Sequence, residues 1–295
     1  MPTARVLIRC PDRSGVVARV ASFLAEAGLN ILDADQHTDP MTGRFFMRVE
    51  FDAGADSPMP GTDDRARIER EFTAAVAEPL SMDAFFRWPV RTKRIAVLAG
   101  PSLHCAADLL WRVSTGEINA EVTRIISNHE SAGDLADRFG HPFHCLPVTK
   151  DTKSQQEAAI ANLLDADRDS PEGLDLIVLA RYMQILSDDF TAARPGRIIN
   201  IHHSFLPAFK GAKPYHQAFE RGVKLIGATS HYVTEDLDQG PIIEQNVQRV
   251  SHRHSAAELR GLGQDVERQV MLRAVRWHLE DRVIVDGHKT VVFVK

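Results

Sequence analysis

The sequence predicts an α/β protein with two domains, a small antiparallel sheet with two helices followed by a larger, doubly wound and mostly parallel sheet. Its 295 residues are enough for about two domains of ordinary size. Up to residue 88 the strand and helix patterns follow the order βαββαβ. After residue 94, helical patterns alternate with continuously apolar strands, which is typical of a parallel sheet covered on both faces.

The first domain is expected to span residues 1–88 with a ferredoxin-like arrangement. A strand at 4–10 leads through a polar turn at 11–15 into a helix at 16–27, whose apolar side chains recur at helical spacing and which Gly28 ends. Hairpin-turn residues at 39–43 join the next two strands. The remaining predicted elements are strands at 29–38, 44–51 and 82–88 and a helix at 63–77.

The second domain is expected to span residues 95–295, after a linker at 89–94 that carries three basic side chains behind a proline. Its predicted strands lie at 95–99, 120–127, 174–180 and 198–202, and its helices at 103–114, 131–139, 154–165 and from about 256. In such sheets, ligand sites form at the carboxyl ends of the strands. Asn200 and His202 lie at such an end.

Composition and charge exclude several classes of function. The formal net charge of −5 offers no general electrostatic reason to bind nucleic acid or an anionic membrane. No apolar run approaches the ~20 residues of a membrane span, and the N-terminus lacks the apolar core of a signal peptide. The three cysteines are widely spaced, which argues against a disulfide framework or a zinc cluster. We therefore expect a cytoplasmic protein with reduced thiols.

The strongest chemical signal is the pair Asn200 and His202, two residues apart on a predicted strand and so on the same face. An amide donor beside an imidazole suits stabilisation of an oxyanion together with proton transfer. Asp238 follows on a Gly/Pro-rich turn and adds a carboxylate. Each residue alone has an ordinary structural interpretation: a satisfied buried amide, a packed histidine and a turn aspartate. Only their combination indicates a site.

The first domain resembles an ACT domain in the segments 10–20, 28–31 and 42–48. The resemblance implies a regulatory module that binds amino acids where the first turn meets the first helix, and that pairs across subunits in a homo-oligomer. Glycine and methionine are the expected effectors. The candidate effector residues are Asp12, Ser14, Gly15 and Asn30, because free backbone N–H groups at a helix start suit a carboxylate. The alternative is a simple helix cap in a domain that serves only dimerisation.

The second domain resembles the folate-dependent formyltransferase superfamily in Asn-Ile-His-His-Ser-Phe-Leu-Pro at 200–207 and Asp-Gln-Gly-Pro-Ile-Ile-Glu-Gln at 238–245. The resemblance implies that Asn200, His202 and Asp238 surround the formyl carbon of 10-formyltetrahydrofolate, with Asn200 and a protonated His202 donating to the oxyanion. It also implies a folate pocket lined by the loop 179–186, in which the matching residues are Arg181, Met183, Ile185 and Leu186. The alternative for this loop is a connection that packs its own core.

No metal or cofactor is expected, because the folate is the substrate. The adjacent His202 and His203 would point to opposite faces of a strand and would coordinate poorly together. The other histidines lack ligand spacing.

The loop at 99–105 decides between transfer and hydrolysis in this resemblance. Transferases of the superfamily bind an acceptor phosphate on a glycine-rich loop at this place. Here Pro101 removes an amide donor, and His104 and Cys105 replace small residues. Water is then the remaining nucleophile, and His203 or His104 is the candidate to position it.

Both halves together resemble the formyltetrahydrofolate deformylase family. The resemblance implies hydrolysis to formate and tetrahydrofolate, in support of purine synthesis and one-carbon folate balance. The alternatives are formyl transfer to a small amine and a catalytically inactive folate or amino-acid sensor.

Overall fold

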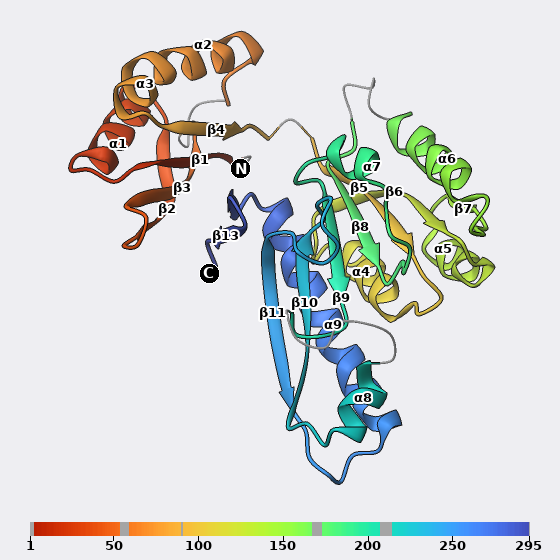
Figure 1. Ribbon diagram of the computed structural model, residues 1–295. Helices are drawn as coiled ribbons and strands as arrows, with labels where there is room; N and C mark the ends of the chain where they lie inside the picture. The colour runs from red at the N-terminus through yellow and green to blue at the C-terminus, as the bar shows by residue number, and fades with distance from the viewer. Residues whose placement is uncertain (1–2, 54–58, 90, 167–172, 207–213, 295) are drawn as a thin grey trace. The chain divides into compact units, whose positions relative to one another are not determined.

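The computed structural model describes residues 3–53, 59–89, 91–166, 173–206 and 214–294 (Figure 1). The chain divides into two compact units. The first contains Met1–Val90 together with Asp281–Ile284 and Val291–Lys295, and the second contains Arg91–Glu280 together with Val285–Thr290. The predicted linker at 89–94 is shorter in the structure, since a strand of the second unit already begins at Lys93; residue 90 lies outside the described residues.

The first unit has the predicted βαββαβ order in a four-stranded antiparallel sheet with the strand order β2-β3-β1-β4. Its buried core comes from the sheet and from the helices that cover one of its faces. The predicted second helix is longer than expected and is interrupted by one π-helical turn at Thr73–Ala77. The other elements are β1 (Ala4–Pro11), α1 (Val16–Glu26), β2 (Asn30–Asp39), β3 (Arg44–Asp52), α2 (Thr62–Phe72), α3 (Glu78–Leu80) and β4 (Asp83–Arg87).

The C-terminal segment differs from the predicted assignment of residues 95–295 to one domain. It forms a hairpin of β12 (Val283–Asp286) and β13 (Lys289–Val292), whose two ends belong to the first unit. Ile284 and Phe293 pack against the sheet residues Leu7 and Phe46. A short apolar hairpin pattern does not itself indicate which sheet it covers, so local sequence could not assign this segment.

The second unit is built on a seven-stranded sheet with the order β11-β10-β9-β8-β5-β6-β7. Five neighbouring strands are parallel, as predicted, and two antiparallel strands extend the sheet beyond β9. The parallel strands are β5 (Lys93–Ala99), β6 (Ala120–Ser127), β7 (Phe143–Cys145), β8 (Leu176–Ala180) and β9 (Ile198–His202). The antiparallel strands are β10 (Leu225–Tyr232) and β11 (Ile242–Arg249).

Helices cover both faces of this sheet, which makes it doubly wound (Figure 1). On one face, α6 (Lys153–Asp165) and α7 (Asp188–Ala192) pack on apolar side chains of β5, β6, β8 and β9. The other helices include α4 (His104–Ser114), α5 (Gly133–Phe139) and α9 (Ala256–Leu279); α9 contacts α4 and the strands β9, β10 and β11. None of the helices in the described part of the chain is long and apolar enough to cross a membrane.

The strand order determines where a ligand can bind. The carboxyl ends of β5, β8 and β9 lie side by side, because these strands are parallel neighbours. The strand order reverses between β5 and β8, and such a switch point opens a crevice at the carboxyl edge of the sheet. Ala99, Ala180 and His202 end the three strands there.

Candidate active site

Four polar side chains converge beside the end of β9. His202 Nδ1 lies 3.2 Å from Asp238 Oδ2, and His231 Nε2 lies 3.6 Å from the other oxygen, Asp238 Oδ1. His231 comes from β10, where the strand register pairs it with Asn200. Asn200 Nδ2 lies 3.2 Å from His231 Nε2. The three residues predicted for the reaction centre are therefore brought together, with His231 as a fourth member.

His231 orients Asn200. Its Nδ1 donates a hydrogen bond of 2.8 Å to the backbone carbonyl of Tyr232, since a carbonyl can only accept. With the proton on Nδ1, Nε2 accepts from the Asn200 amide. This holds the amide plane and leaves the second N–H of Asn200 available to a substrate oxygen.

The Asp238 carboxylate is held on a strained turn. Asp238 has a left-handed φ of 55°, a conformation that Asp and Asn tolerate better than most residues. Two residues later, a Cβ at Gly240 would lie 1.8 Å from the Tyr232 carbonyl oxygen, so only glycine fits there. The hydrogen bond from His202, and after it the nearby His231 ring, lower the pKa of Asp238 and outweigh its burial. The carboxylate is therefore ionised at neutral pH.

The remaining nitrogen of His202, Nε2, is buried and has no hydrogen-bond partner among the described residues. Buried polar atoms in native proteins are nearly always paired, so this nitrogen at the wall of a cavity is available to a water or a ligand. His202, Asn200 and Asp238 all line a cavity of about 420 Å³, which we call the Asn200 cavity. The residues predicted to bind folate, Arg181, Met183, Ile185 and Leu186, line the same cavity.

The loop after β8 owes its shape to close backbone contacts. Arg181 and Met183 both have left-handed φ values, of 61° and 59°. Such conformations cost about 1 kcal/mol or more for ordinary side chains and cluster at ligand sites. A Cβ at Gly100 would lie 1.7 Å from the Arg181 carbonyl oxygen. The backbone after β5 can therefore approach this loop so closely only because residue 100 is a glycine.

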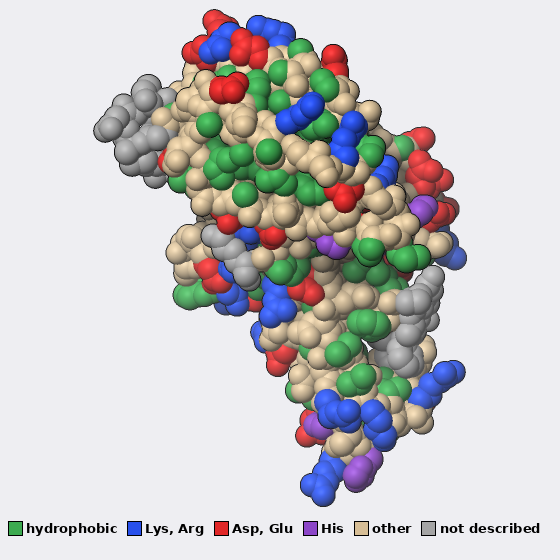
Figure 2. Space-filling model, turned by 90° about the vertical axis from the view of Figure 1, so that its left-hand side faces the viewer, with side chains coloured by type: hydrophobic (Ala, Val, Ile, Leu, Met, Phe, Trp, Pro, Cys, Tyr) green, Lys and Arg blue, Asp and Glu red, His purple; other side chains and the backbone are tan. Residues whose placement is uncertain are grey.

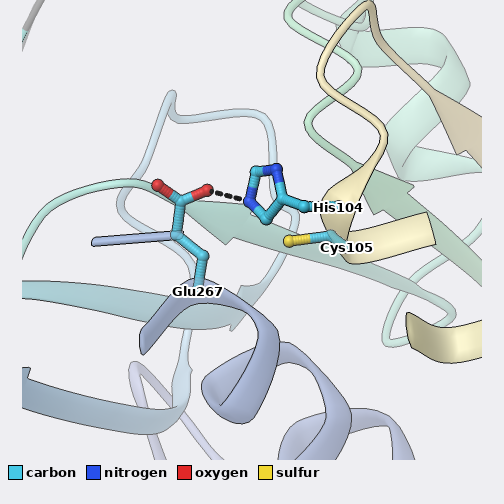
Figure 3. Close-up of side chains that lie close together, drawn as sticks. All are labelled: His104, Cys105 and Glu267. Carbon is cyan, nitrogen blue, oxygen red and sulfur yellow. Dashed lines mark hydrogen bonds and ion pairs between the residues drawn. The ribbon is translucent and has the colours of Figure 1, made fainter. Parts of the chain in front are cut away.

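His104 lies in a neighbouring cavity rather than at the reaction centre. This second cavity, also of about 420 Å³, is lined by Ser102, His104, Tyr215, Arg260 and Glu267 among others, and we call it the Glu267 cavity. Figure 3 shows His104 and Cys105 at the start of α4, facing Glu267 on α9. His104 Nε2 donates to Glu267 Oε2 over 2.8 Å, and Nδ1 lies 3.2 Å from Ser102 Oγ. Both ring nitrogens are thus already used.

Glu267 is the centre of a buried polar cluster that the sequence analysis did not identify. Tyr215 Oη donates to Oε1 over 2.5 Å, and Arg181 Nε lies 3.4 Å from Oε2. Burial raises the pKa of Glu267, but the His104 hydrogen bond and the Arg181 charge together lower it by more than burial raises it. The net shift of the pKa is therefore downward. The carboxylate is therefore ionised although only 1% of the residue is exposed.

His104, Cys105 and Glu267 place their potential ligand atoms within 4.8 Å of one another. The chemistry does not suit a metal ion. Both Glu267 oxygens already accept hydrogen bonds, and the Arg181 guanidinium lies beside them. Burial and the Glu267 charge raise the pKa of the Cys105 thiol well above its usual range, so the thiolate that a metal requires is disfavoured. We interpret these residues as an ion-pair cluster.

His203 lies where the two cavities meet. Together with Arg181 and Met183 it lines both of them, and its ring stacks on that of His202 at a centroid distance of 5.1 Å. Only 8% of His203 is exposed, yet neither of its ring nitrogens has a hydrogen-bond partner among the described residues. Burial, and then the nearby Arg181 charge, lower the pKa of His203 to about 4. The ring is neutral at pH 7 and can accept a proton or a hydrogen bond.

This lowered pKa predicts acid-sensitive stability that depends on His203. The unfolded chain protonates this histidine near its ordinary pKa of about 6.5, while the folded chain does so only near pH 4. The contribution is thus fully present above pH 6.5 and is lost as the pH falls to about 4. The shift corresponds to a free energy of unfolding of roughly 3 kcal/mol.

Urea unfolding at pH 7 and pH 4 tests this contribution of His203. Between these two pH values, the wild type should lose roughly 3 kcal/mol more stability than His203→Gln. His252→Gln, at an exposed histidine outside both cavities, should retain the wild-type loss, and an equal loss in all three proteins would refute the assignment.

The predicted effector residues are only partly brought together. Asp12, Ser14 and Gly15 lie at the start of α1, where Gly15 is the N-cap and no side chain caps the helix. Asn30 begins β2 and pairs with Asp52, whereas Pro11 pairs with Arg44 at the other end of the same sheet. The rise of a strand separates the two ends by roughly 25 Å. Within one chain, Asn30 therefore cannot join the other three residues, which corrects that prediction.

Comparisons with known proteins agree with this geometry. The family model described as formyl transferase matches residues 93–275, and the ACT domain model matches residues 4–58. A formyltetrahydrofolate deformylase from Bacillus subtilis is 49% identical over 290 residues, which cover 98% of this chain and 93% of that protein.

Solved structures give the same result. The crystal structure of a formyltetrahydrofolate deformylase from Pseudomonas syringae is similar with a TM-score of 0.91 and 46% identity, covering 100% of this chain and 95% of that one. Glycinamide ribonucleotide transformylase 1 from Symbiobacterium toebii is similar over 69% of this chain and 95% of its own, with a TM-score of 0.62 and 32% identity. The transformylase thus matches a portion of this chain, and the deformylase matches all of it.

Proposed function

The chain belongs to the formyltetrahydrofolate deformylase family, hydrolases of the formyl C–N bond, and from this premise we propose that Asn200, His202 and Asp238 carry out the hydrolysis of 10-formyltetrahydrofolate. The products are formate and tetrahydrofolate. The observation that carries the proposal is the buried, unpaired His202 Nε2 between Asn200 and Asp238. The pterin of the substrate occupies the Asn200 cavity against the 181–186 loop.

The three side chains divide the chemistry between them. Water attacks the formyl carbon while His202 Nε2 takes its proton, and the carbonyl electrons become an oxyanion. Asp238, paired with His202 Nδ1, stabilises the imidazolium that forms. The free N–H of Asn200 and the imidazolium donate to the oxyanion. The oxyanion then re-forms the carbonyl, the C–N bond breaks, and His202 returns its proton to N10. The formic acid that results loses its remaining proton to water and is released as formate.

His203 is our candidate for positioning the water. It lines the Asn200 cavity beside His202, and its neutral ring offers an acceptor to a water O–H. The other candidate, His104, has both nitrogens engaged by Ser102 and Glu267 and lines only the Glu267 cavity. No step requires a metal or a cofactor.

A product assay tests this function. Purified protein with 10-formyltetrahydrofolate and no amine should release formate and tetrahydrofolate in equal amounts. Adding glycinamide ribonucleotide should leave the formate yield unchanged. Formyl transfer to that amine would show that the chain is a transferase, and the absence of formate release at high protein concentration would favour a sensor.

We propose that the first unit binds an amino-acid effector, with glycine and methionine as candidates. The uncapped first turn of α1 leaves backbone N–H groups for a carboxylate, Ser14 adds a hydroxyl, and Asp12 can accept from an ammonium group. Isothermal titration with each amino acid should show that Asp12→Ala weakens binding about tenfold, the loss of one charge-assisted hydrogen bond. Asp35→Ala, on exposed β2, should bind as the wild type does. No binding of either amino acid to the wild type would leave dimerisation as the role of this unit.

We also propose a homo-oligomer formed through the first unit, in the cytoplasm. The strand β2 lies at an edge of its sheet and is exposed over most of its length. Such an edge presents unpaired backbone groups that a second copy can cover. Sedimentation of the intact protein should show more than one chain, and a monomer at micromolar concentration would contradict the proposal.

A further inference from the structure

The two cavities of the second unit are neighbours. Each has a volume of about 420 Å³, and Arg181, Met183 and His203 belong to the walls of both. The folate occupies the Asn200 cavity in the proposed reaction. After the C–N bond breaks, tetrahydrofolate still fills that cavity, so the small product has to wait for it or leave by another side. The Glu267 cavity is the space next to the reaction centre on that other side.

The charges in the Glu267 cavity favour an anion. Glu267 is the one carboxylate that the described residues contribute to its wall, and it already accepts hydrogen bonds from His104 and Tyr215 and lies beside Arg181. Arg260 also lines the cavity, is exposed, and has no charged or hydrogen-bonding partner among the described residues. The wall therefore carries one positive charge that nothing in the described chain neutralises.

The surface near the Glu267 cavity also carries positively charged side chains. Figure 2 shows Lys, Arg and His side chains grouped at the lower end of the second unit. That end contains α8 (Pro214–Glu220), the segment from α8 to β10, and the end of β11 with its connection to α9. Its exposed basic residues are Arg221, Lys224, Arg249, His252 and Arg253. His216 of α8 and Ala256 of α9 belong to the cavity wall. A basic rim favours the approach and the retention of small anions.

Arg181 connects the two cavities chemically. Its Nε and Nη1 atoms are buried and make no hydrogen bond of good geometry among the described residues. Glu267 therefore attracts the guanidinium by charge and does not form a bidentate hydrogen-bonded ion pair with it. A guanidinium matches the two oxygens of a carboxylate. At the junction it stands where a carboxylate formed beside His202 would pass from one cavity to the other.

We propose that the Glu267 cavity is a carboxylate site that receives formate from the reaction centre, so that formate leaves before tetrahydrofolate. The inference rests on the proposed function, because it takes formate as the product. Arg181 and His203 meet the anion at the junction, and Arg260 holds it on the outer side. The release involves no covalent step.

Product inhibition tests the order of release. In an ordered reaction with one substrate, the last product to leave competes with the substrate and the first does not. We expect sodium formate to be a noncompetitive inhibitor against 10-formyltetrahydrofolate, and tetrahydrofolate to be competitive, at constant ionic strength. The reverse pattern, with competitive formate, would mean that formate leaves last through the Asn200 cavity and would overturn the proposal. Absence of any formate production would instead contradict the proposed function itself.

A pair of variants locates the site. Arg260→Gln should raise the inhibition constant of formate roughly three- to fivefold, the range for one partly exposed ion pair, and leave that of tetrahydrofolate unchanged. Arg253→Gln removes an equal charge from the same basic end outside both cavities and should change neither constant. Equal weakening in both variants would reduce the effect to general electrostatics and reject a defined site.

Direct binding distinguishes the anion. With tetrahydrofolate saturating the protein, the NMR signal of [¹³C]formate should still broaden on binding, and sodium acetate should displace it less well than unlabelled formate. If bound tetrahydrofolate abolishes the broadening, the two products share one cavity. If inorganic phosphate displaces formate at far lower concentration, the cavity is built for a phosphate and the assignment to formate is wrong.

Discussion

Asn200→Ala should lower kcat by about 10²- to 10³-fold, the usual loss when one oxyanion donor is removed. The Asn200 amide lies against His231 Nε2 with its other N–H unused, and it lines the cavity next to His202. Because the oxyanion exists only in the transition state and the intermediate, KM for 10-formyltetrahydrofolate should change little. Initial rates of formate release over a range of substrate concentrations measure both constants.

The fold should survive this change. Asn200 is only partly buried, and its backbone bonds in β9 do not depend on the side chain. We expect a loss of about 1 kcal/mol from the broken His231 contact. Asn246→Ala on β11 of the same sheet removes an asparagine whose amide bonds Gln269 outside both cavities, and it should keep full activity. A kcat within fivefold of the wild type for Asn200→Ala would remove the amide from the mechanism.

The centre of the site could be predicted because its residues follow local rules. Asn200 and His202 share a strand face, and both lie where that strand ends in a parallel sheet. Asp238 lies two residues before Gly240, where a Cβ would clash with the Tyr232 carbonyl oxygen. The sequence leaves His231 open between a site residue and a structural strand histidine. Its contact with Asn200, 31 residues away, needed the structure, because only the register of β10 on β9 brings the two together.

The cluster around Glu267 shows what sequence patterns miss. Its carboxylate contacts His104, 163 residues away, and Tyr215, 52 residues away. A signal was present: Glu267 lies in α9 among the buried side chains of Val266, Val270 and Met271, and an acid on an apolar helix face has to find partners. Local spacing shows that such a residue needs a partner, but it does not identify the partner. The partners depend on how α9 packs against α4 and α8.

Asp238→Asn should lower kcat by roughly 10²- to 10⁴-fold, the range for a general acid–base group. Asparagine tolerates the left-handed φ of 55° at this position, so the change removes the charge while sparing the backbone. An amide can donate to His202 Nδ1, which would move the ring proton to Nε2 and leave no base facing the water. It also no longer stabilises the imidazolium that forms.

The pH dependence of stability separates this role from a structural one. The pKa of Asp238 is lowered in the folded state, so its stabilising contribution is present above the unfolded pKa near 4 and is lost as the pH falls further. Asp238→Asn should therefore be less stable than the wild type at pH 7, and the difference should shrink steadily as the pH falls from 4 to 2, as measured by urea unfolding. Asp189→Asn, at an exposed aspartate outside both cavities, should match the wild type in kcat. If Asp238→Asn kept a kcat within fivefold of the wild type, with the expected loss of stability, the carboxylate would serve the fold alone, and His202 would need another partner to act as a base.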